Sequence, residues 1–220
     1  IGVGLNTLFT NTLGDRNVAI GSQALHYLNP ASSVDTYNTA VGYYAGFNVT
    51  TGTALTLVGG LAGDSLTACD FNTAIGFAAL TDDTLGSKTT AIGYQALATQ
   101  NFASATDTYN TALGFQAGKS VTTGVKNVLI GGQAGYALRD ADYNVALGTY
   151  ALAADLLGSR SVAIGHAALY SQSFASATDV YNVAVGFQAG LAITTGTINT
   201  LIGGLSGDAL TTGNSNVALG

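Results

Sequence analysis

The sequence predicts an all-β fold, a parallel β-solenoid of about twelve coils arranged as three tandem 72-residue repeats. A five-residue motif, Asn-[Thr/Val]-Ala-[Ile/Val/Leu]-Gly, recurs from one end of the chain to the other. Its glycines are spaced by 17, 21, 17 and 17 residues, and this series occurs three times between Gly4 and Gly220. Turn-forming residues interrupt every run that could become a helix. A short motif at a fixed period indicates coils that stack on one another.

The motif copies define a single repeat domain over residues 1–220. Gly4, Gly76, Gly148 and Gly220 are equivalent, so the repeats cover about residues 4–75, 76–147 and 148–219. The chain begins and stops inside copies of the motif, and its ends carry no atypical sequence. Because a solenoid needs capping repeats to cover its end coils, we expect a fragment of a longer fibre. Further repeats or other domains would continue it along its axis.

Each motif is expected to form a short strand whose side chains alternate between two faces. The residue before the glycine is Ile, Val or Leu, as in Ile75 and Ile92. The residue two positions earlier is Thr or Val, as in Thr73 and Thr90. Since β-branched and aliphatic side chains are favoured in packed sheets, the pattern predicts that these two columns face the interior.

The opposite face of each predicted strand carries the motif alanine and glycine. In every fourth coil leucine replaces the alanine, at Leu57, Leu129 and Leu201. Only 8% of the residues are charged, so a solvent-exposed row of leucines would favour aggregation. We therefore expect these three leucines to form a chain–chain interface.

Asparagine begins most copies of the motif, as in Asn110, Asn127 and Asn144. Stacked asparagines can hydrogen-bond along the coils as a ladder and close the turn before each strand. We expect this ladder to be structural.

The 21-residue coil adds a longer loop once per repeat, at residues 26–35, 98–107 and 170–179. Loops on a rigid scaffold often carry contacts with partners. We therefore expect these loops to project and to meet partners. Two alternatives stay open: the aromatic rings could fold down over the core, and the aspartates could close Asx-turns. The candidate contact residues are Pro30, Phe102, Phe174, Asp35, Asp107 and Asp179.

Charge and hydropathy exclude two classes of partner. The chain has 12 acidic residues against 6 basic ones, for a net charge of −6. An acidic chain without a basic cluster is not expected to bind nucleic acid. No apolar run reaches the roughly 18 residues of a membrane helix, so we expect no membrane insertion of this segment.

The stretches NTAIGFAAL, from Asn72 to Leu80, and TAIGYQAL, from Thr90 to Leu97, resemble the YadA-type head repeats of trimeric autotransporter adhesins. They are also similar to the NTAIGYQAL-type repeats of phage tail fibres and bacterial surface fibres. The resemblance extends over essentially the whole chain. It implies a left-handed parallel β-roll, three chains side by side, and a fibre outside the cell. Coils of 17 and 21 residues are longer than the typical adhesin-head repeat.

Carboxylate pairs are the candidates for catalysis, because glycoside hydrolysis needs two carboxyl groups at a set separation. The three loop aspartates recur four coils apart, which is roughly 19 Å at ~4.8 Å per strand. That separation is too large for a pair. Asp82-Asp83 and Asp140-Asp142 are close in sequence, but neither pair recurs in all repeats. We expect no catalytic residue.

Histidines and glycine-linked aspartates are the candidates for metal binding. His26 and His166 occupy different columns of the repeat, and spacing suggests no nucleophile beside either. Asp15, Asp64 and Asp208 each follow a glycine, but the calcium-binding nonapeptide pattern is missing. We expect no metal and no cofactor.

The sequence thus predicts a structural or adhesive segment, shaft or head, of an extracellular homotrimeric fibre on a cell surface or a virion. The expected partner is the chain itself, with a host-surface receptor or a glycan as a further candidate. One alternative is a carbohydrate-active, tailspike-like β-helix. Another is an ice-binding solenoid, which the expected burial of the Thr column disfavours.

Overall fold

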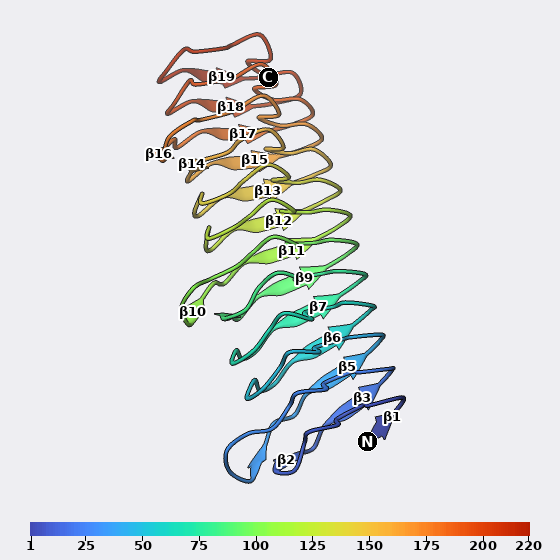
Figure 1. Ribbon diagram of the computed structural model, residues 1–220. Helices are drawn as coiled ribbons and strands as arrows, with labels where there is room; N and C mark the ends of the chain where they lie inside the picture. Colours follow the sequence, from blue (N-terminus) through green and yellow to red (C-terminus); the bar gives the residue numbers. More distant parts are fainter. The chain divides into compact units, whose positions relative to one another are not determined.

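The computed structural model describes all of residues 1–220 and contains only strands and turns (Figure 1). Thirteen strands form one parallel sheet in which the strands follow one another in chain order. This arrangement confirms the predicted parallel β-solenoid. The strands of this sheet are β1 (Gly2–Val3), β3 (Val18–Ile20), β5 (Thr39–Val41), β6 (Thr56–Val58), β7 (Thr73–Ile75), β9 (Thr90–Ile92), β11 (Thr111–Leu113), β12 (Val128–Ile130), β13 (Val145–Leu147), β15 (Val162–Ile164), β17 (Val183–Val185), β18 (Thr200–Ile202) and β19 (Val217–Leu219).

Three further pairs of two-residue strands flank the long loops. In each pair the strand that ends a long loop runs parallel to a strand of the preceding coil. The pairs are β2 (Gly14–Asp15) with β4 (Val34–Asp35), β8 (Gly86–Ser87) with β10 (Thr106–Asp107), and β14 (Gly158–Ser159) with β16 (Thr178–Asp179).

The chain divides into two compact parts, an N-terminal part, Ile1–Tyr109, and a C-terminal part, Asn110–Gly220. The boundary falls inside the second 72-residue repeat. Within each part the coils follow the same pattern.

Equivalent residues of neighbouring strands pair in register. In the N-terminal part Ala40 pairs with Leu57, and Leu57 with Ala74. The middle residue of each of these strands is buried, whereas its two neighbours are half-buried. A three-residue strand directs one side chain to one side and two to the other. The alanine column therefore faces the interior, and the prediction that the Thr/Val and Ile/Val/Leu columns are buried is wrong.

The interior is narrow and is filled mainly from the wall opposite the sheet. Leu25, Leu80 and Leu97, four residues after a motif glycine, are fully buried. These large side chains leave space only for alanine on the facing strand. Burial of a leucine contributes about 1.5–3 kcal/mol, so the return segment of each coil supplies much of the core.

The motif glycine is required for two reasons, as Gly76 illustrates. Its φ is +131°, a backbone conformation that residues with a Cβ atom rarely adopt. A Cβ there would also lie 2.5 Å from the carbonyl oxygen of Gly93 in the next coil. The coils therefore stack backbone against backbone at this corner.

Leu57, Leu129 and Leu201 lie in the core of the chain itself. The prediction that they form a chain–chain interface is wrong. The turns near Leu57 carry glycine, at Gly46 and Gly63, where other coils carry leucine. The leucine fills the volume that these glycines leave.

The predicted asparagine ladder is confirmed. Asn127 N–H donates to the Oδ1 atom of Asn110 at 2.9 Å, and Asn144 N–H donates to that of Asn127 at 2.9 Å. The Nδ2 atom of Asn127 donates to the carbonyl of Ala141 at 2.8 Å. Since both ends of the side chain are paired, the column can be buried.

Candidate functional site

The outward face of the thirteen-stranded sheet is uncharged, with one aliphatic column and one column of Thr and Val. The Ile/Val/Leu column and the Thr/Val column both lie there, and neither contains a charged residue. Ile20 and Ile202 are 41% and 43% exposed. Successive side chains in such a column are ~4.8 Å apart, so each part presents a regular apolar strip. Contiguous apolar strips on a protein surface mark sites of interaction.

Aromatic residues follow several of the motif glycines and extend this apolar surface. Tyr43, Phe77, Tyr94, Phe115 and Phe187 are all exposed. In the N-terminal part the rings of Phe77 and Tyr94 stack with their centroids 5.9 Å apart. The edge of the sheet face is therefore apolar as well.

The long loops do not project their aromatic residues. Phe102 and Phe174 are only 6% and 7% exposed, and Pro30 is also buried. The prediction that these three residues meet partners is wrong, and the alternative that the rings cover the core is confirmed. Phe174 is fixed by its backbone N–H, which donates to Asp155 Oδ1 at 3.2 Å.

The loop aspartates pair with a basic residue from the preceding coil. Arg16 Nε lies 2.8 Å from Asp35 Oδ1, and Arg160 Nε lies 2.9 Å from Asp179 Oδ1. The third pair is Lys88 with Asp107, at 2.5 Å. These carboxylates are thus engaged within the chain, and partly exposed ion pairs of this kind contribute little to stability.

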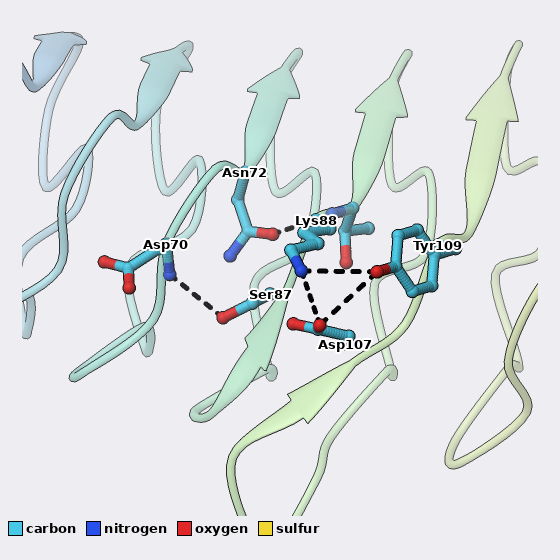
Figure 2. A network of polar contacts seen from close by, with 7 residues as sticks. Asp70, Asn72, Ser87, Lys88, Asp107 and Tyr109 are labelled. Carbon is cyan, nitrogen blue, oxygen red and sulfur yellow. Dashed lines mark hydrogen bonds and ion pairs between the residues drawn. The ribbon is translucent and has the colours of Figure 1, made fainter.

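A tyrosine completes each of these clusters, as Figure 2 shows for the second one. Lys88 Nζ donates to the hydroxyl of Tyr109 at 3.2 Å and lies 5.2 Å from the centre of its ring. Tyr109 also donates to Asp107 at 3.4 Å. The hydrogen bond to Asp107 raises the pKa of Lys88. The loop is thereby tied to the coil before it.

Two carboxylates, Asp83 and Asp155, are fully buried, which the sequence pattern did not predict. Gln172 Nε2 donates to Asp155 Oδ2 at 2.6 Å, and Gly158 N–H donates to Oδ1 at 3.1 Å. Gln100 makes the same contact with Asp83 at 2.6 Å. Burial raises the pKa of Asp83 even though these donors favour its ionised form. No cation neutralises either group in the salt bridges of the chain.

The aspartate and its glutamine partner vary together between the repeats. In the first repeat Asn11 stands where the later repeats have Asp83 and Asp155, and Leu28 stands where they have glutamine. Asn11 exchanges hydrogen bonds of 2.8 and 2.9 Å with the backbone of Gly14. The acid therefore occurs only together with the glutamine that binds it.

One buried polar group has no hydrogen-bond partner, the Nδ2 atom of Asn17. In other coils this atom donates to a carbonyl 14 residues later, as Asn38 does to Gly52 at 2.7 Å. In the coil of Asn17 the chain continues into the long loop, so no carbonyl lies at this position to accept from the Nδ2 atom. The later repeats have Thr89 and Ser161 at this position, which lack the amide group.

Two further carboxylates, Asp140 and Asp142, support turns. Asp142 Oδ1 accepts from Val125 N–H at 2.8 Å, and Asn214 makes the same contact with Thr197 one repeat later, at 2.7 Å. An uncharged amide thus performs the same task. Asp140 accepts hydrogen bonds from Thr122 and Thr123, which lower its pKa.

The two histidines pack against aromatic rings. His26 stacks between Phe9 and Phe47, with centroids 5.2 Å from each. His166 stacks on Phe187 at 5.4 Å. No group of three or more His, Cys and Asp side chains is arranged to hold a metal ion. No helix has the length and apolarity that a membrane crossing needs.

A search of family models, of curated proteins and of solved structures finds no match to this chain.

Proposed function

We propose that this chain is a structural or adhesive segment, shaft or head, of an extracellular homotrimeric fibre such as a surface adhesin or a phage tail fibre. The observation that carries the proposal is the uncharged outward face of the sheet, with its Ile/Val/Leu and Thr/Val columns. The number of three chains and the extracellular location rest on the resemblance to fibre repeats.

Repetition makes such an interface strong. Full burial of one aliphatic side chain contributes about 1.5–3 kcal/mol, so completing the burial of a half-exposed one contributes about 1 kcal/mol. Each coil adds one such side chain to the column. Association along several coils therefore accumulates energy without any single dominant contact.

The test is the mass of the chain in solution, measured by sedimentation equilibrium over a range of concentrations. We expect three chain masses for the native sequence. The double variant Ile75→Asp/Ile92→Asp should sediment as one chain, because two charges would then lie in the interface. A native chain that stays monomeric at the highest concentration would overturn the proposal.

Ice binding is a second candidate, because the Thr column lies on the outward face and not in the interior. Thr39, Thr56, Thr73 and Thr90 are consecutive and pair in register. A flat row of threonines beside aliphatic side chains is a surface that can order water. Thermal hysteresis of the monomeric chain tests this candidate, since a trimer that covers the face would show none.

The tailspike-like alternative needs two carboxylates in one surface groove. A groove of about 730 Å³ on the turns is lined by hydroxyl, amide and aromatic side chains, without a carboxylate. Asp83 is buried, and Asp140 and Asp142 support turns. These placements support a non-catalytic role. Release of reducing ends from bacterial polysaccharides would contradict it.

A further inference from the structure

The N-terminal part contains an open groove of about 730 Å³ on the turns of its coils. A volume of this order is typical of sites for small organic ligands. The groove takes residues from five successive coils, which corresponds to roughly 19 Å at ~4.8 Å per coil. Its lining residues are Thr10, Tyr27, Asn29, Asn48, Thr50, Ser65, Thr67 and Thr84.

Some of the lining groups are already hydrogen-bonded and shape the groove. Thr10 Oγ1 donates to the carbonyl of His26 at 2.9 Å, and Thr67 Oγ1 donates to that of Thr84 at 2.9 Å. Asn48 Nδ2 donates to the carbonyl of Asp64 at 2.9 Å. These bonds run from one coil to the next, so they hold the walls of the groove in place.

Other lining groups have no partner within the chain. They are the hydroxyls of Tyr27, Thr50 and Ser65, the Oδ1 atom of Asn48 and the Nδ2 atom of Asn29. Together they offer both donors and acceptors along the groove. A ligand that carries many hydroxyl groups satisfies such a set.

Tyr27 adds an aromatic surface in a fixed orientation. Its ring is 44% exposed. The rings of His26 and Phe47 hold it edge to face, with centroid distances of 4.6 and 5.0 Å. An aromatic ring with an apolar body and a polar hydroxyl suits the mixed surface of a sugar.

No charged side chain lines the groove. Acidic ligands such as phosphates, nucleic acids and sulfated or sialylated glycans would find no cation there, in a chain whose net charge is −6. The lining therefore selects an uncharged ligand.

The positions 72 residues further along the chain differ. Thr99 replaces Tyr27, Ala137 replaces Ser65, Arg139 replaces Thr67 and Leu156 replaces Thr84. The aromatic residue, the three hydroxyls of Ser65, Thr67 and Thr84, and the absence of charge are all lost. The combination is thus specific to the first repeat, although the backbone pattern is shared.

We propose that this groove binds a short, uncharged oligosaccharide, with Tyr27 against a sugar ring and the amides and hydroxyls of Asn29, Asn48, Thr50 and Ser65 hydrogen-bonded to its hydroxyl groups. The proposal rests on the adhesive role proposed above. It does not depend on the number of chains in the assembly.

The test uses the full chain on an array of neutral oligosaccharides and of their sialylated and sulfated counterparts. The neutral compound that binds best is then measured by titration calorimetry. Tyr27→Thr, which introduces the residue of the second repeat, and Thr50→Val should each weaken binding about tenfold, as expected for the loss of one stacking or hydrogen-bonding contact. The control Ser171→Ala changes the equivalent position of the third repeat and should bind as the native chain does.

Unchanged melting temperatures of the variants would show that lost binding is not lost folding. Absence of any neutral ligand, a preference for the charged counterparts, or unchanged binding by Tyr27→Thr would overturn the proposal. The mass of the same samples separates the two proposals. A monomer that binds neutral sugar supports the groove and contradicts the trimer, whereas a trimer that binds none contradicts the groove alone.

Discussion

Leu57 occupies the space that a side chain at Gly46 would need: a Cβ on that glycine would lie 2.6 Å from the Cδ1 atom of Leu57. A second glycine, Gly63, faces the other methyl group of the same leucine, at 3.0 Å. In the coils of Ala19 and Ala74 leucine takes the place of the glycine. The coil of Ala40 keeps Gly46, because Leu57 of the next coil fills the space there. A large side chain on the strand is thus matched by glycine on the opposite wall of the core.

This exchange predicts a compensating pair of substitutions. Leu57→Ala should destabilise the chain by about 2–5 kcal/mol, because it opens a cavity. Gly46→Leu alone should cost about 1–3 kcal/mol through overpacking. The double variant should be more stable than the sum of the two costs predicts, since Leu25 and Leu80 adopt the same positive φ at this position. Urea unfolding of the four proteins gives the coupling energy, and strict additivity would contradict the contact.

The orientation of the sheet predicts opposite results for two neighbouring residues. Ala74→Asp places a carboxylate in the core and should destabilise the chain by more than about 3 kcal/mol. Ile75→Asp places it on the outward face and should leave the melting temperature of a single chain nearly unchanged. Thermal unfolding at a concentration where the chain is monomeric compares them. Equal losses would mean that both side chains are buried.

Burial of Asp83 predicts a dependence of stability on pH. Its pKa in the folded chain lies above the ordinary value of 3.8, so the folded state binds the proton more tightly than the unfolded state. The contribution of this group is therefore most favourable below the unfolded pKa and is lost as the pH rises through the raised folded pKa. Asp83→Asn should remove this loss, so that the variant gains stability relative to the native chain as the pH rises.

The measurement for Asp83 is urea unfolding from pH 3 to pH 7, a range of roughly four units that spans an ordinary carboxyl titration. Asp82→Asn is the matched control, because Asp82 is exposed and its carboxylate makes none of the salt bridges of the chain. If the free energies of unfolding of Asp83→Asn and of the native chain differ by the same amount at every pH, the raised pKa of Asp83 is contradicted.

The buried position of Phe102 predicts a structural role. Phe102→Ala should cost about 3–5 kcal/mol, as is usual for a buried aromatic ring. Ala103→Ser, on the exposed part of the same loop, should change the unfolding free energy by less than about 0.5 kcal/mol. Denaturant unfolding measures both. A Phe102→Ala variant of native stability would show that the ring does not cover the core.

The unpaired amide of Asn17 predicts a stabilising substitution. Asn17→Thr removes the orphaned donor, whose burial costs about 1–3 kcal/mol. The hydroxyl can pair with Thr36, as Thr89 pairs with Thr108 at 2.7 Å one repeat later. We expect a higher melting temperature by calorimetry. A loss of stability would mean that the contacts of the Asn17 Oδ1 atom with Thr36 and Asn38 matter more.

The spacing of the motif was sufficient to predict the stacked parallel strands and the asparagine ladder, because both follow from a local pattern repeated at a fixed period. The orientation of the strands was predicted wrongly, since alternation divides Thr73 and Ile75 from Ala74 but does not say which side is inside. The missing information lay in the turns, where Leu57 occurs together with Gly46 and Gly63. Compensation in size between two segments indicates that they share one interior.

The candidate sites were harder to predict for a different reason. Whether Phe102 projects or folds down depends on its contact with the buried cluster of Asp83 and Gln100, whose residues are distant in sequence. The groove takes its lining from five coils, and each residue alone is an ordinary turn residue. Only their placement side by side distinguishes Tyr27 and Thr50 from the many other polar residues of the turns.

The hydrogen bonds of the asparagine ladder all have the same direction along the chain. Each carboxamide oxygen accepts the backbone N–H of a coil that comes later in the sequence, as Asn144 does for Ser161 and Asn182 does for Asn199. A coil that has formed therefore offers an acceptor to the segment that a ribosome makes next. Such a chain can fold in the order of its synthesis, one coil at a time, with each finished coil as the template for its successor.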